Sequence, residues 1–157
     1  MENGYVDYLA LLDHLSDHLE RLAELARNKM DAVRRDDLVA LDQVLNQEQA
    51  MALAMRGLEQ KRLKLLKELG WNDLPLRDVP DHYPSELRLR AKEAVQELQR
   101  DYQVYQGAAE AARHTLEINL HEIEKVVAGS GGVQAAGPGY RPREVEPPAA
   151  MRTDIRA

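Results

Sequence analysis

The feature of this sequence that most constrains its fold is the recurrence of apolar residues every three or four positions over three long stretches. In residues 5–33, one apolar row starting at Tyr5 and another starting at Tyr8 repeat every seven residues, and Lys29 interrupts the second row. This spacing places apolar side chains along one face of an α-helix and is typical of helices that pack side by side. The first stretch therefore predicts a helix over about residues 5–35.

A charged break, Arg34-Arg35-Asp36-Asp37, separates the first stretch from the second. Cations suit the carbonyl end of a helix, and aspartates can cap the start of the next one. The break predicts a tight antiparallel turn, followed by a helix over about residues 37–69. The glycine that follows Leu69 predicts a C-terminal cap.

Two charged residues, Glu48 and Arg62, fall near the apolar seam of the second helix. They are separated by about 21 Å along the helix at 1.5 Å per residue, so they cannot pair with each other. Each needs a partner on another helix or water at the end of the bundle. We interpret both as polar contacts that set the register, with a functional contact as the alternative.

The third apolar stretch is the longest and predicts a helix over about residues 84–127. Residues 71–83 before it contain Pro75 and Pro80, which continue neither helix nor strand, so this segment is predicted to cross the end of the hairpin. Pro84 suits the first turn of the helix. At 1.5 Å per residue the third helix is about 15 to 20 Å longer than the other two and should overhang them.

The sequence after residue 127 differs in kind, because its glycines and prolines support no regular element. The predicted fold is therefore all-α: an antiparallel helical hairpin and a long third helix form a coiled-coil-like three-helix bundle in residues 1–127. Residues 128–157 are predicted to be a disordered C-terminal tail.

Composition and motifs exclude several functions. The net charge of −6, without a long basic cluster, argues against nucleic-acid binding, and no apolar run is long enough to insert into a membrane. The start of the chain lacks the basic residues of a secretory signal, which predicts a cytoplasmic protein. His14 and His18 lie off the seam without a third ligand, and no catalytic or phosphate-binding motif occurs. We therefore expect no enzyme activity, no metal and no cofactor.

The overhanging part of the third helix is the candidate binding site. Its apolar stripe continues where the shorter helices have ended, and an uncovered apolar stripe is a liability in a monomer. The stripe could therefore bind a second copy, giving a homodimer, or receive a partner helix. The candidate residues are Leu116, Asn119, Leu120, Ile123 and Val127.

Several stretches, taken in chain order, resemble one known family. They are NKMDAVRRDDLVAL (residues 28–41), Glu48-Gln49, LEQKR (58–62), LLKELG (65–70), Asn119-Leu120, Tyr140 and the closing Asp154-Ile155-Arg156. In this order they resemble the FlgN-like flagellar type III export chaperones, over nearly the whole chain. The sequence departs from that family in its glycine-rich spacer at residues 129–139 and in Pro147-Pro148.

The resemblance implies a cytoplasmic chaperone that binds the hook-associated, hook–filament junction proteins FlgK and FlgL. Such a chaperone prevents their premature assembly and delivers them to the flagellar export apparatus, without ATP or metal. It also implies that the C-terminal part of the chain grips the client. By position, the stripe of the third helix would form the groove, with Tyr140 and Ile155 as tail anchors.

Two other classes of function remain open at this point. The chain could be a structural coiled-coil adaptor or dimerisation module, or a FliT-like export chaperone, although its length and long third helix favour the FlgN-like type. A histidine phosphotransfer domain is disfavoured, because His14 and His18 have Asp and Leu neighbours instead of Lys and small residues.

Overall fold

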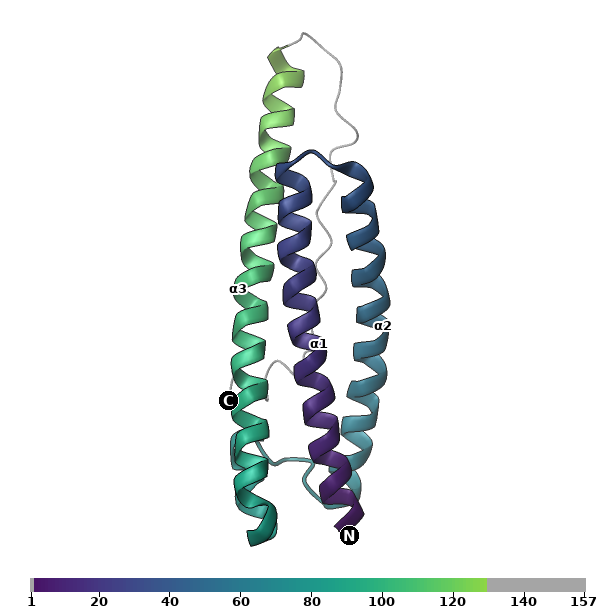
Figure 1. Ribbon diagram of the computed structural model, residues 1–157, viewed down its shortest axis with the longest axis vertical. Helices are drawn as coiled ribbons and strands as arrows, with labels where there is room; N and C mark the ends of the chain where they lie inside the picture. The colour runs from purple at the N-terminus through teal and green to yellow at the C-terminus, as the bar shows by residue number, and fades with distance from the viewer. Residues whose placement is uncertain (1, 130–157) are drawn as a thin grey trace.

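The computed structural model describes residues 2–129, which form three long α-helices and one short 3₁₀ helix (Figure 1). The elements are α1 (Glu2–Arg34), α2 (Leu38–Leu69), η1 (Leu76–His82) and α3 (Ser85–Gly129). The predicted all-α fold, with a helical hairpin and a longer third helix, is confirmed. Residues 130–157, and with them nearly all of the predicted tail, lie outside the described part.

Helix α1 occupies the middle of the bundle, with α2 on one side and α3 on the other (Figure 1). It packs extensively against both neighbours, antiparallel to α2 and parallel to α3. A central helix buries two faces, so α1 buries more residues than the two predicted rows contain. The additional buried side chains include Leu11 and Leu25, which are 2% and 0% exposed.

The turn between α1 and α2 has the predicted antiparallel form and a defined geometry. Asp36 adopts a left-handed backbone conformation, with φ of 52°. The N–H groups of Asp36 and Asp37 donate to the carbonyls of Val33 and Ala32, at 3.1 and 2.9 Å, which satisfies the last carbonyls of α1. The carboxylate of Asp37 then caps α2 by accepting from the N–H of Ala40 at 3.0 Å.

The predicted helix bounds need small corrections. Helix α1 begins at Glu2 instead of residue 5, and its first turn packs against the end of α2, where a Cβ added to Gly4 would lie 3.1 Å from Leu69 Cδ2. Helix α2 begins one residue later than predicted, since Asp37 is its cap. Helix α3 runs two residues past the predicted end, to Gly129, and begins just after Pro84.

The segment between α2 and α3 was predicted to be irregular, and that was wrong in part. It crosses the end of the bundle as expected, but residues 76–82 form the 3₁₀ helix η1. Proline fixes φ near the value that a 3₁₀ helix uses. Pro75 and Pro80 therefore favour this helix, and their carbonyls accept from Asp78 and Tyr83 at 3.0 and 3.1 Å.

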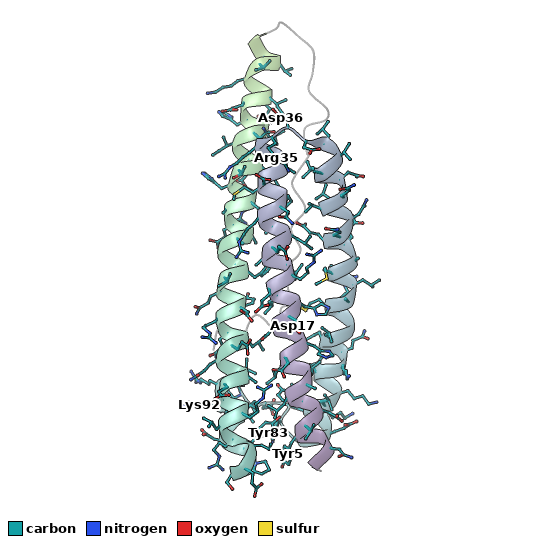
Figure 2. The ribbon with its side chains drawn as sticks, viewed as in Figure 1. Tyr5, Asp17, Arg35, Asp36, Tyr83 and Lys92 are labelled. Carbon is teal, nitrogen blue, oxygen red and sulfur yellow. The ribbon has the colours of Figure 1, made fainter. Side chains whose placement is uncertain are left out.

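Aromatic side chains close this end of the bundle, which we call the closed end. The Trp71 ring, 8% exposed, lies 5.4 to 6.3 Å from four other rings, and the Tyr83 hydroxyl donates to the backbone carbonyl of Tyr5 at 2.8 Å. Figure 2 shows Tyr5 and Tyr83 together at this end. The cluster consists of Tyr5, Tyr8, Trp71, His82 and Tyr83.

The packing of α2 on α1 includes buried charges. Lys29, which interrupts an apolar row of α1, pairs with Glu48 of α2 at 2.9 Å, and both are nearly fully buried. The prediction of a partner on another helix is confirmed for Glu48. Arg62 pairs with Glu59 of its own helix through two hydrogen bonds of 3.0 Å, so its partner is not on another helix as predicted.

Candidate functional site

A groove of about 190 Å³ lies at the other end of the bundle, which we call the open end. Its walls come from the last turn of α1, the turn that follows, the first turns of α2, and α3. Beyond the groove α3 continues alone, past the ends of α1 and α2 (Figure 1). The lining residues are Ala32, Val33, Asp36, Asp37, Leu38, Leu41, Leu116, Asn119, Leu120 and Ile123.

The position of the groove follows from the register of α1 and α3. These helices run in parallel, and Arg90 pairs with Asp13 near the closed end. An equal rise per residue along both helices brings Arg34, the last residue of α1, level with the part of α3 next to Ala112. Ala112 is fully buried, whereas no residue of α3 from 113 to 129 is buried. The groove therefore begins where the support of α1 ends.

Four of the five candidate residues on α3 line this groove. Leu116, Asn119 and Leu120 are half-buried, and Ile123 is 48% exposed. Val127 is half-buried one turn further on and is not part of the lining. The two tail candidates, Tyr140 and Ile155, lie outside the described residues.

The opposite wall of the groove was not predicted from the sequence. The stripe of α3 was expected to lack any cover from the same chain, but residues of the α1–α2 turn line the same groove. The reason is geometric: the turn reaches the level of Leu116 to Ile123, so Leu38 and Leu41 face α3 across the groove. Leu38 is 76% exposed, so this wall faces solvent.

The charged residues of the groove are both acidic. Asp37 caps α2 and also lies 3.7 Å from Arg35, which in turn pairs with Asp31 at 3.1 Å. Asp36 makes no side-chain hydrogen bond or ion pair in the described part of the chain. It is exposed and stands at the turn, where Figure 2 labels it beside Arg35. The groove therefore combines an apolar floor with an uncompensated negative charge at its rim.

Away from the groove, the structure gives little sign of metal or catalytic chemistry. Within residues 2–129, the one group of three possible ligands is Glu20, Glu97 and Asp101, on α1 and α3. Desolvation and the two neighbouring glutamates raise the pKa of the Asp101 carboxyl. This group contains no histidine, and both glutamates are exposed. We interpret it as an acidic surface cluster.

Comparison with known proteins identifies the family. The model of the FlgN protein family matches residues 1–135, which include all three long helices and the whole groove. The chain belongs to the FlgN family. The match ends before Tyr140 and Ile155. No curated protein and no solved structure matches the chain.

Membership of the FlgN family confirms the resemblance found in the sequence and establishes the general function. FlgN proteins are non-enzymatic flagellar export chaperones for the hook-associated proteins FlgK and FlgL, and they work in the cytoplasm. The family also implies contact with the export apparatus. None of the helices in residues 2–129 is sufficiently long and apolar to cross a membrane.

Proposed function

We propose that this FlgN-family chain holds its hook-associated client in the groove at the open end. The observation that carries the proposal is the meeting of three apolar walls at the point where α3 loses its support. The exposed Val126 and the half-buried Val127 extend the apolar surface along α3 beyond the groove. An apolar groove that continues along one helix fits the apolar face of an amphipathic client helix.

The contacts in such a complex would be made mainly by α3. Leu116, Leu120 and Ile123 supply apolar contacts, Asn119 supplies a donor and an acceptor, and Val127 extends the surface by one turn. A client segment that becomes ordered only when it binds gives up part of the interaction energy as conformational entropy. Moderate affinity and ready release follow, and both suit a protein that must deliver its client to the export apparatus.

The division of the chain is part of the proposal. Residues 1–127 would form the chaperone domain, and residues 128–157 a tail that contacts the client through Tyr140 and Ile155. Replacing both tail residues with alanine in the full chain should weaken client binding without any loss of helicity. Unchanged binding would remove them from the site.

The groove is tested by two double variants with the same chemical change. Leu120→Asp with Ile123→Asp places two charges in the groove, whereas Leu53→Asp with Leu63→Asp places them on exposed positions of α2. Titration calorimetry with purified FlgK or FlgL should show at least about a 100-fold loss of affinity for the first variant, because two apolar contacts are replaced by charges that must be desolvated. The second variant should bind like the unmodified protein.

The readouts separate binding from folding. Circular dichroism should give the same helicity for both variants, since none of the four positions is buried. Capture of FlgK or FlgL by the groove variant at full affinity would show that the client binds elsewhere.

A homodimer through the same surface is the second candidate, because Ile123 and Val126 would also fit a second copy. Light scattering without client distinguishes the two uses. A stable dimer that the groove variant dissociates would favour a structural dimerisation module.

A further inference from the structure

We infer that the segment held in the groove carries a lysine or arginine that pairs with Asp36. This inference rests on the proposed function and adds a specificity-determining contact to it. Asp36 lines the groove, is exposed, and has no ion-pair partner within residues 2–129. A client side chain of opposite charge would provide that partner.

The local field also favours a cation at this point. The groove is lined by the last turn of α1, where the carbonyl ends of the helix concentrate negative partial charge. The start of α2 lies opposite, but the carboxylate of Asp37 already occupies it by accepting from Ala40. No lysine or arginine lines the groove. Arg34 and Arg35 precede Asp36 in the chain, and Arg35 pairs with Asp31 and Asp37 instead of with Asp36.

The backbone gives an independent reason to assign a role to Asp36. The hairpin has two helix ends of the same design, each with a left-handed residue just after the helix. At the closed end that residue is Gly70, with φ of 75°, the residue type that adopts this conformation without a steric penalty. At the open end it is Asp36, with φ of 52°. A side chain kept where glycine fits more easily is consistent with a function of that side chain.

The test replaces Asp36 with asparagine, which removes the charge and keeps a residue that tolerates the left-handed conformation. The matched control is Asp17→Asn, on the exposed surface of α1 near the middle of the bundle, which changes the net charge equally (Figure 2). With the full chain and purified FlgK or FlgL, we expect Asp36→Asn to bind about fivefold more weakly at low ionic strength. Because salt screens exposed charges, this difference should shrink at high salt. Asp17→Asn should bind like the unmodified protein.

The reciprocal change identifies the partner residue. In the client, each lysine and arginine of the terminal helical segments is changed singly to glutamate. One of these client variants should bind the unmodified chaperone more weakly than the unmodified client does. The same client variant should bind the Asp36→Lys chaperone better than it binds the unmodified chaperone. Equal affinities of Asp36→Asn and Asp17→Asn would overturn the inference. If Leu120→Asp with Ile123→Asp still abolished binding in that case, the groove itself would stand.

The other possible sources of the cation are outcomes of the same experiment. The chain's own Arg141, Arg143, Arg152 and Arg156 are changed together to glutamine in the full-length protein. If the effect of Asp36→Asn then disappears, the partner cation belongs to this chain, and the inference fails. If the effect remains, the cation belongs to the client. A loss of dimerisation upon Asp36→Asn would assign the cation to a second copy and would also overturn the inference.

Discussion

The two ends of this bundle are built from the same three helices but differ in what covers them. At the closed end, η1 crosses the bundle, and Tyr8, Trp71 and Tyr83 are buried together. At the open end, the short turn of residues 35–37 joins α1 to α2, while α3 continues beyond both (Figure 1). The apolar side chains that α2 and α3 contribute to the groove there remain half-buried or exposed.

This difference separates stability from binding along the length of the molecule. Buried aromatic side chains contribute strongly to the free energy of folding, whereas half-exposed side chains contribute little. The closed end can therefore hold the hairpin and α3 in register. The open end can expose an apolar surface without much loss in the free energy of folding.

The largest effect should come from truncating an aromatic residue at the closed end. We expect Trp71→Ala to lower the free energy of unfolding by about 3 to 5 kcal/mol, because it leaves a cavity among four other aromatic rings. Leu120→Ala, at the half-buried groove, should cost less than about 1 kcal/mol. Urea unfolding followed by circular dichroism measures both. Similar losses for the two variants would show that stability is not concentrated at the closed end.

An intermediate effect is expected at Tyr83, whose hydroxyl donates to the Tyr5 carbonyl. Tyr83→Phe removes this hydrogen bond and should cost about 1 kcal/mol at neutral pH. Burial, with Tyr8 and Tyr5 nearby, raises the pKa of the Tyr83 phenol above the usual value of about 10. The folded protein therefore retains a proton that the unfolded chain loses above about pH 10.

The resulting pH dependence has a definite sign. Below about pH 10 the contribution of neutral Tyr83 is fully present, and above it the free energy of unfolding should fall by up to about 1.4 kcal/mol per pH unit. Tyr83→Phe should show a smaller decrease, because phenylalanine has no proton to lose. The two proteins are compared by their urea midpoints between about pH 8 and about pH 11, a range that includes the ordinary tyrosine pKa. Parallel curves for the two proteins would exclude Tyr83 as the source.

Much of the fold was predictable because helical periodicity, breaks and caps are local properties. The apolar rows, Asp37 as a cap and Gly70 as a C-terminal residue all followed from neighbouring positions. The Lys29–Glu48 pair did not, because it depends on the register between two helices. Gly4 of α1 lies beside Leu69 of α2, so two residues that face each other across the hairpin have numbers that add up to about 73. By this rule Glu48 lies about one helical turn away from the position opposite Lys29. The long lysine side chain covers that distance.

The candidate groove was predictable on one side only. The third helix is longer than its neighbours, so the apolar face of its extra length can be identified from the sequence. Periodicity alone gives Leu116, Asn119 and Leu120. The opposite wall required the level at which the α1–α2 turn meets α3, which depends on how the segment with η1 crosses the closed end. Asp36 also needed the structure, because a left-handed conformation at a single aspartate is not encoded in the heptad pattern.

The smallest effect should be that of Asp36→Gly, and its sign should be opposite to that of Gly70→Ala at the other left-handed residue. Gly70→Ala places a Cβ in open space but at φ of 75°, so its cost is conformational and should be about 1 kcal/mol. Asp36→Gly removes the same kind of backbone strain at the open end but raises the conformational entropy of the unfolded chain. The free energy of unfolding should therefore rise by only about 0.5 kcal/mol. Urea midpoints of both variants test this directly.

The combination of stability and binding makes the last comparison decisive. If Asp36 were present only to form the turn, Asp36→Gly would stabilise the protein and leave client affinity unchanged. If Asp36 serves the client, the same variant should be more stable and bind FlgK or FlgL more weakly, by about the same factor as Asp36→Asn. A residue whose removal improves folding and impairs binding would mark the open end as a surface maintained for a partner, at a small cost that the closed end offsets.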